Sequence, residues 1–169
     1  TLPFSTLRNV RMSPTFSGRQ AEAIHTMPFM PMAHAVLMPK TPFWEKDGLG
    51  ITTFSDGPSG MCIAQSYDAD PQKINAFLVF ARGHWPGYLD RRGPEAAKAL
   101  ILADYEAARP AAKGQLDVAH YFSWSADPFS AGDWGYFMPG QITRFFKDFA
   151  KPHGRLAFAG EHTAALNRG

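Results

Sequence analysis

The side chains that could carry chemistry are scattered along this chain of 169 residues, and the common catalytic patterns do not connect them. Its histidines, at positions 25, 34, 84, 120, 153 and 162, include no His-x-x-x-His pair that would place two imidazoles on one helix face. There is no Gly-x-Ser-x-Gly motif for a nucleophilic serine, and no Gly-x-Gly-x-x-Gly or Walker loop for a phosphate. A metal centre and a serine hydrolase are therefore disfavoured, and we predict no metal site.

Charge and cysteine content exclude further classes. The chain carries 17 basic and 15 acidic side chains without a run of like charge, which argues against a nucleic-acid partner. The single cysteine, Cys62, has apolar neighbours, so we predict a buried thiol on a strand. No apolar stretch reaches the roughly 20 residues of a bilayer span, and the N-terminal residues do not resemble a signal peptide. We expect a soluble protein, with the cytoplasm favoured as its compartment.

Three segments in the C-terminal third stand out. They are, in order, Trp124-Ser-Ala-Asp-Pro-Phe-Ser-Ala-Gly132, Tyr136-Phe-Met-Pro-Gly-Gln141 and Gly154-Arg-Leu-Ala-Phe-Ala-Gly-Glu-His-Thr-Ala164. Taken singly, the last is typical of a strand that ends in a glycine turn, and Trp124 and Tyr136 are typical of core aromatics. Their occurrence together, in this order, is what needs explaining.

Hydrophobic periodicity predicts the elements that position these segments. We expect a strand over residues 7–12, a helix of about ten residues capped by Ser17, and strands near residues 32–38, 60–67 and 74–81. The clearest helix runs from Pro94 to Arg109, because a proline begins it and Pro110 follows it.

Two further elements are predicted near the C-terminus. Strict alternation of apolar side chains over residues 116–124 predicts a half-buried strand, with His120 on its apolar face. Ile142, Phe145, Phe146 and Phe149 recur at helical spacing and predict a short amphipathic helix. Strands and helices that do not alternate strictly indicate an α+β fold with a mixed, largely antiparallel sheet flanked by helices.

The three segments resemble those of the flavin-containing amine oxidase family, which includes monoamine, polyamine and L-amino-acid oxidases. The similarity extends upstream to Thr1-Leu-Pro-Phe4 and to Pro42-Phe-Trp44 with Gly48. It implies a substrate-binding domain over residues 5–150, with residues 1–4 and 151–169 as strands and other pieces of an FAD-binding domain. The implied activity is oxidation of an amine to an imine by hydride transfer to FAD.

The resemblance also implies roles for individual residues. Gly160 allows close backbone approach to the cofactor, Glu161 can accept hydrogen bonds from its ribityl hydroxyls, and the N-terminus of a following helix favours its phosphates. Thr163 is also implied as a residue that binds the cofactor. Trp124 corresponds to a tryptophan beside the flavin ring. Asp133, Trp134 and Tyr136 correspond to residues that flank the substrate cavity.

The chain departs from the family pattern at three points. The residue that matches a lysine holding a water beside the flavin is His34, which could hold that water with a pKa nearer neutrality; a plain strand histidine is the alternative. The segment after Trp124 contains no cysteine, whereas relatives that bind FAD covalently use one there, so noncovalent FAD is implied. The dinucleotide-binding glycine motif is absent, so most of the cofactor site is expected in a missing N-terminal part.

Two other functions stay open at this point. A non-catalytic binding or scaffold module derived from the same fold would cover the apolar residues of its ends, whereas an excised domain would leave them exposed; these residues are Leu2, Phe4, Leu156 and Phe158. A flavin enzyme that acts on a C–C bond is the third possibility. The particular amine, the electron acceptor and the oligomeric state are not evident from the sequence, and four arginines (Arg8, Arg11, Arg82 and Arg144) are candidates for binding the carboxylate of an amino acid.

Overall fold

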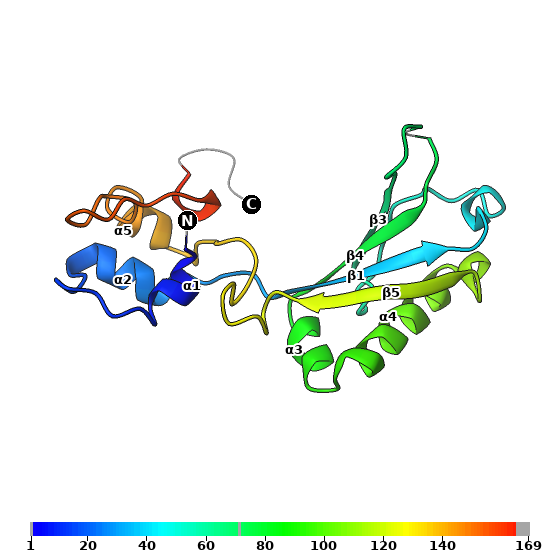
Figure 1. Cartoon of the computed structure of the whole chain (residues 1–169), viewed down its shortest axis with the longest axis horizontal. Coiled ribbons are helices and arrows are strands. Elements are labelled where there is room, and N and C mark those ends of the chain that lie inside the picture. Colours follow the sequence, from blue (N-terminus) through cyan, green and yellow to red (C-terminus); the bar gives the residue numbers. More distant parts are fainter. Residues whose placement is uncertain (1, 71, 165–169) are drawn as a thin grey trace. The chain divides into compact units, whose positions relative to one another are not determined.

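The computed structural model describes residues 2–70 and 72–164. The chain divides into two compact units, which we describe separately. The sheet unit comprises Pro31–Trp124, and the terminal unit combines Thr1–Met30 with Ser125–Gly169. Figure 1 shows the strands of the sheet unit and the short helices of the terminal unit. No helix among the described residues is long and apolar enough to cross a membrane.

The sheet unit is built on one antiparallel sheet with the strand order β2-β3-β4-β1-β5. Its strands are Met32–Pro39 (β1), Thr53–Phe54 (β2), Met61–Gln65 (β3), Ala76–Arg82 (β4) and Leu116–Ser123 (β5). The strands predicted near residues 32–38, 60–67 and 74–81 are thus confirmed, as is a fold that combines helices with an antiparallel sheet.

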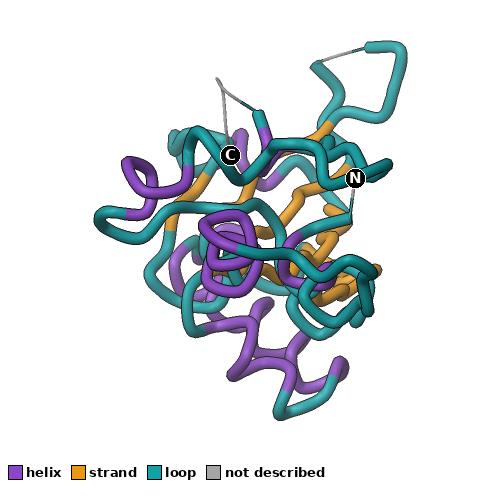
Figure 2. The backbone as a smooth tube through the Cα atoms, turned by 90° about the vertical axis from the view of Figure 1, so that its left-hand side faces the viewer, coloured by secondary structure: helices purple, strands orange, loops and turns teal. Residues whose placement is uncertain are grey.

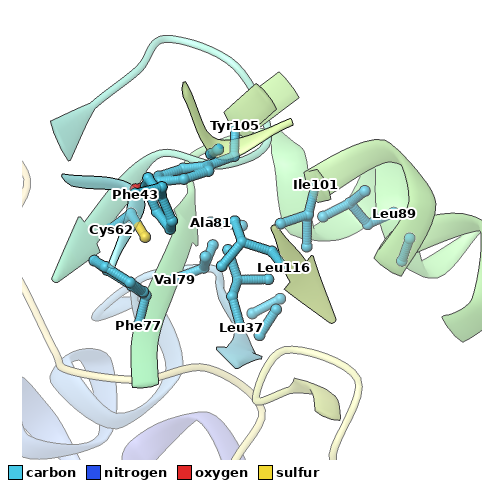
Figure 3. Close-up of a cluster of buried hydrophobic side chains, with 14 residues drawn as sticks. Leu37, Phe43, Cys62, Phe77, Val79, Ala81, Leu89, Ile101, Tyr105 and Leu116 are labelled. Atoms are coloured by element: carbon cyan, nitrogen blue, oxygen red, sulfur yellow. The ribbon is translucent and has the colours of Figure 1, made fainter. Parts of the chain in front are cut away.

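Two helices cover one face of this sheet: α3 (Trp85–Asp90) and α4 (Pro94–Ala108). A single core joins them to the strands, and Figure 3 shows its side chains converging from both layers. It includes Leu37 of β1, Phe77 and Val79 of β4, and Ile101 and Tyr105 of α4, each at most 1% exposed. Cys62 lies in the same core and is fully buried, as predicted.

Helix α4 begins and ends where the sequence predicts. Pro94 occupies its first turn, where no amide donor is needed, and Gly93 precedes it with a φ of +83°. Its buried residues Ala97, Ile101 and Tyr105 recur every fourth position, so one stripe of the helix faces the sheet. Two short 3-10 helices, η1 (Phe43–Glu45) and η2 (Pro110–Ala112), complete the unit.

A β-bulge changes the predicted alternation of β5. Val36 of β1 pairs with His120, but Leu37 pairs with Val118, so Ala119 is an extra residue in the strand. Before the bulge, Leu116 is buried. After the bulge, Ser123 is buried and His120 is exposed. The prediction that the alternating residues of 116–124 all share one face is therefore wrong: His120 does not face the same side as Leu116, because one inserted residue reverses the facing of all those that follow.

The terminal unit contains α1 (Phe4–Leu7), α2 (Gly18–Thr26), α5 (Gln141–Phe145) and the 3-10 helix η3 (Glu161–Thr163). Loops make up much of the remainder of this unit (Figure 2). Its core joins residues from both ends of the chain, namely Phe4, Leu7, Ala23, Ile24, Met27, Phe145 and Phe149. The predicted helix after Ser17 is confirmed, with Ser17 as its N-cap, and so is a short helix that begins at residue 141.

The predicted strand over residues 7–12 is wrong. The chain instead forms one helical turn, in which the Leu7 amide donates to the Pro3 carbonyl at 2.8 Å and the Arg8 amide to Phe4 at 3.2 Å. This turn buries Phe4 and Leu7 on one side, which an extended chain would not do. Neither residues 2–4 nor residues 155–160 form a strand in the described chain; His153 and Leu156 form an isolated bridge. The predicted domain boundaries at residues 5 and 150 stay a prediction, and residues 1 and 165–169 lie outside the described residues.

Candidate functional site

The sheet unit has a second face that α3 and α4 do not cover. Side chains alternate across a strand, so the residues that pair with one another across β4, β1 and β5 share a face. One row of this open face consists of Phe80, His34 and Phe122, and the next of Leu78, Val36 and His120. Phe122 is 37% exposed although it is large and apolar. The open face is therefore largely apolar, and it carries His34 on β1 and His120 on β5.

The structure brings His34 and Trp124 together on the open face. The Trp124 amide donates to the carbonyl of Met32, so Trp124 lies opposite Met32 and diagonal to His34, within reach of a long side chain. The indole Nε1–H of Trp124 donates to Nδ1 of His34 at 3.2 Å. The two residues are 90 positions apart in the sequence. The sequence nominated both of them singly, without any sign that they would touch.

Aromatic rings surround the imidazole of His34. Its centroid lies 4.6 Å from that of Phe80, with the rings at 73°, and 6.1 Å from that of Trp124, with the rings at 84°. Phe122 in turn packs edge-on against Trp124 at 4.7 Å. Such edge-to-face contacts hold rings in defined orientations. His34 is thus an oriented polar group within an aromatic wall.

The Gly-Glu-His-Thr segment lies in the terminal unit and forms the beginning and body of η3. Gly160 has a φ of +128°, a conformation that side-chain-bearing residues rarely adopt, and its carbonyl accepts the Thr163 hydroxyl at 2.8 Å. Glu161 is exposed, and its carboxylate accepts the backbone amide of Gly135 at 3.2 Å. The structure therefore connects two segments that the sequence nominated separately, residues 133–136 and residues 160–163.

A ladder of backbone hydrogen bonds holds the segment of Asp133, Trp134 and Tyr136. The Asp133 amide donates to Met30 at 3.0 Å, the Met30 amide to Trp134 at 2.8 Å, and the Tyr136 amide to Pro28 at 3.1 Å. The three side chains that the sequence nominated are all partly buried. Gly135, at the centre of this ladder, is fully enclosed: a Cβ there would lie 2.8 Å from Cε of Met27 and 3.0 Å from Cβ of His162.

His162 is a residue that sequence reasoning missed. Its side chain is buried, and its ring packs edge-on against Phe4 at 4.7 Å and obliquely against Phe29 at 5.6 Å. It thereby connects the nominated Gly-Glu-His-Thr segment to the core of the terminal unit. The signal was its place directly after Glu161 in the nominated motif.

The structure separates the four candidate arginines. Arg144 pairs with Glu22 at 2.8 Å, and Arg8 donates to the backbone carbonyls of Phe4 and Met27 at 3.0 Å. Partial burial holds the pKa of Arg8 below its usual value. Arg8 and Arg11 also line a surface hollow of about 390 Å³ in the terminal unit. Arg82, at the end of β4, lies opposite Met32 in the register of β4 and β1. It is therefore the arginine of the four that shares a face of the sheet with His34.

Among the described residues, no group of three or more histidine, cysteine, aspartate or glutamate side chains is arranged to hold a metal ion. The nominated polar side chains instead occur singly. His34 lies beside aromatic rings, and Glu161 lies in the 3-10 turn η3.

Comparison with known proteins places this chain in a family. The model of the flavin containing amine oxidoreductases matches residues 1–169. This chain belongs to that family. An L-amino-acid oxidase of Siganus canaliculatus is 29% identical in an alignment 160 residues long, gaps included, that covers 89% of this chain and 29% of that protein. A flavin-dependent L-tryptophan oxidase of Lentzea aerocolonigenes is 29% identical in an alignment 181 residues long, gaps included, that covers 98% of this chain and 36% of that protein.

Solved structures of flavin amine oxidases share the fold. A variant of putrescine oxidase aligns with 97% of this chain and 36% of its own length, at a TM-score of 0.77 and 21% identity. Cyclohexylamine oxidase from Brevibacterium oxydans aligns with 96% of this chain and 36% of its own, also at 0.77, with 17% identity. The chain thus spans about a third of the length of the relatives it matches.

The residues present fit a flavin, the cofactor that the family implies. Glu161 offers an exposed carboxylate as a hydrogen-bond acceptor, and a Cβ on Gly160 would come within 3.0 Å of the His162 ring, so that position keeps a bare backbone. Trp124 offers an aromatic ring whose only polar atom is already engaged by His34. Acceptors for ribityl hydroxyls and a flat apolar ring are the groups that a flavin requires.

Proposed function

We propose that this chain is the substrate-binding part of an FAD-dependent amine oxidase, and that it is incomplete as a catalyst without further polypeptide. The proposal rests on the family match along residues 1–169 and on the third of the relatives' length that the chain spans. The observation that carries it is the Trp124–His34 pair on an apolar, partly exposed sheet face. The substrate would be a small amine, converted to an imine.

Bound FAD would supply the acceptor for a hydride from the carbon that bears the amine. On this chain, Gly160, Glu161 and Thr163 would bind its ribityl and phosphate groups, and Trp124 would pack beside its ring. With no cysteine in residues 124–141, we propose noncovalent binding, largely by parts of the protein outside this chain.

The remaining nominated side chains would serve the substrate. Trp134 and Tyr136 would form aromatic walls that suit a neutral amine, and Asp133 would orient its polar end. His34 would hold a water molecule next to the reacting atoms. Arg82, on the open face with His34, is our candidate for the carboxylate of an amino-acid substrate.

Visible absorption spectroscopy tests this proposal. We expect flavin bands to appear with FAD when the chain is combined with the N-terminal part of the protein, and to bleach when an amine is added. Glu161→Gln should weaken FAD binding about tenfold, as expected for a hydrogen bond to a charged acceptor. The matched control is Glu95→Gln, because Glu95 is an exposed acid paired only with Lys98 on the surface of α4. Failure to bind flavin in the combined protein would refute the proposal.

A non-catalytic module is the second candidate, and one observation favours it. Phe4 is fully buried, and its ring contacts Phe149, Phe158 and His162 of the same unit. Phe158 and Leu156 are partly buried, and only Leu2 of the four end residues is exposed, at 44%. Apolar ends covered in this way are what an independent module would have. Amine-dependent bleaching of the flavin would exclude this function, whereas absence of flavin binding would support it.

A further inference from the structure

The hydrogen bond between Trp124 and His34 defines where His34 carries its proton. An indole Nε1–H is a donor only and can never accept a hydrogen bond. At 3.2 Å it donates to Nδ1 of His34, so Nδ1 must present a lone pair. A neutral imidazole has one protonated nitrogen, so the proton is on Nε2.

The hydrogen bond from Trp124 favours the neutral ring of His34. Protonation of Nδ1 would set two donors, N–H against N–H, at the position of the present hydrogen bond. Arg82 lies on the same face of the sheet and would not stabilise a second positive charge.

Packing holds the indole in place to make this bond. Trp124 lies edge-on to Phe122 at 4.7 Å, and the imidazole lies edge-on to Phe80 at 4.6 Å. The indole is thus held by a neighbour two residues earlier in its own chain segment, and the imidazole by a neighbour on the adjoining strand β4. A phenylalanine at position 124 could keep this packing but could not donate.

From this geometry we infer that Trp124 is a positioning residue, which holds His34 as the neutral tautomer protonated at Nε2. His34 then acts toward a ligand as a hydrogen-bond donor and not as a general base, since its only lone pair is occupied by the indole. The inference deepens the proposed function, on which it rests for the nature of the ligand: a donor at Nε2 binds a water or substrate lone pair. It removes His34 from the groups that could deprotonate the amine.

Nuclear magnetic resonance of the protein without FAD tests the tautomer. Long-range ¹H–¹⁵N correlation, above the pH range in which histidines titrate, identifies the protonated ring nitrogen; His34→Asn assigns the signals. We expect Nε2 protonated in His34, with the preference for this tautomer reduced about two- to tenfold in Trp124→Phe. His120, exposed on the same face, is the internal reference and should keep its ratio. A proton on Nδ1 of His34, or a ratio unaltered by Trp124→Phe, would overturn the inference.

The indole signals give a second readout. In His34→Asn the Nε1–H resonance of Trp124 should shift, whereas that of Trp85, which donates to the Asp56 carbonyl at 2.7 Å, should stay unchanged. An unmoved Trp124 resonance would contradict the hydrogen bond. Because neither measurement needs flavin or amine, the expected tautomer in a protein that never binds flavin would refute the proposed function alone. Flavin-dependent amine oxidation with the wrong tautomer would refute the positioning role alone.

Discussion

Arg109, directly after the last residue of α4, is joined to Asp47 by two parallel hydrogen bonds. Its Nε donates to Oδ2 at 2.8 Å and its Nη2 to Oδ1 at 2.9 Å. The Arg109 side chain is 1% exposed, and its Nη1 also donates to the Gly50 carbonyl at 3.0 Å. The pair therefore attaches the loop after η1 to the end of α4, because the buried guanidinium of Arg109 binds both Asp47 and the Gly50 carbonyl.

This pair predicts a loss of stability in acid. The hydrogen bonds from Arg109 hold the pKa of Asp47 below its usual value, and Asp47 in turn raises that of Arg109. A carboxylate with a lowered pKa in the folded state adds stability above its unfolded pKa of about 3.9, and this stability is lost as the pH falls through the folded value. Urea unfolding should show Asp47→Asn less stable than the wild type at pH 7, with the difference shrinking below about pH 4.

The control for this prediction is Asp117→Asn. Asp117 pairs with Lys40 at 2.9 Å, but both side chains are about half exposed or more, at 69% and 48%, so water screens the pair. Its replacement should change the free energy of unfolding by no more than about 1 kcal/mol. Equal effects of the two substitutions at pH 7 would contradict the role assigned to Arg109.

Cys62 should be unreactive in the folded protein. Burial raises the pKa of its thiol to about 12, and only the thiolate attacks alkylating reagents or disulfides. At pH 8 we expect no labelling by a thiol reagent without denaturant and complete labelling of one thiol in its presence. Thr52→Cys in a Cys62→Ala background should react at once, because residue 52 is exposed. Rapid labelling of the native wild type would disprove the burial.

Phe77 should be among the most costly core side chains to remove. It is fully buried, with its ring centroid 5.7 Å from Phe43, 5.4 Å from Trp44 and 6.3 Å from Tyr105. Phe77→Ala should lower the free energy of unfolding by about 3–5 kcal/mol, measured by urea titration. Phe54→Ala is the matched control: Phe54 is 72% exposed and should lose less than about 1 kcal/mol. Comparable losses at the two positions would argue against this core.

Gly135 should not tolerate a side chain. The added methyl of Gly135→Ala would press on Met27 and on Cβ of His162, and the latter cannot move without its buried ring. We expect a loss of about 1–3 kcal/mol in the free energy of unfolding. In Gly154→Asn nothing lies within 4 Å of the new Cβ, and asparagine tolerates the φ of +59°, so stability should change little. A neutral Gly135→Ala would show that this segment packs more loosely.

Much of this protein follows from its sequence because local patterns carry the information. Pro94 in its first turn, Pro110 shortly after its last residue, and an apolar residue at every fourth position within it are enough to define α4. The short apolar run over residues 32–38 likewise indicates β1, and the Phe-Ala-Gly-Glu motif indicates the family. These features depend on near neighbours along the chain, so they are visible before folding.

Tertiary structure decided the rest, because pairing between distant strands determines which way a side chain faces. The bulge at Ala119 reverses the phase of β5, and only the register against Val36 and Leu37 reveals it. The same reversal brings Trp124 to the face of His34, 90 residues earlier, where the indole selects the tautomer of the imidazole. The first residues form a helical turn, not a strand, and Phe4 joins a core that combines residues 23–27 with Phe145 and Phe149 near the other end of the chain. Sequence named the groups of the candidate site, and long-range contacts determined which of them touch.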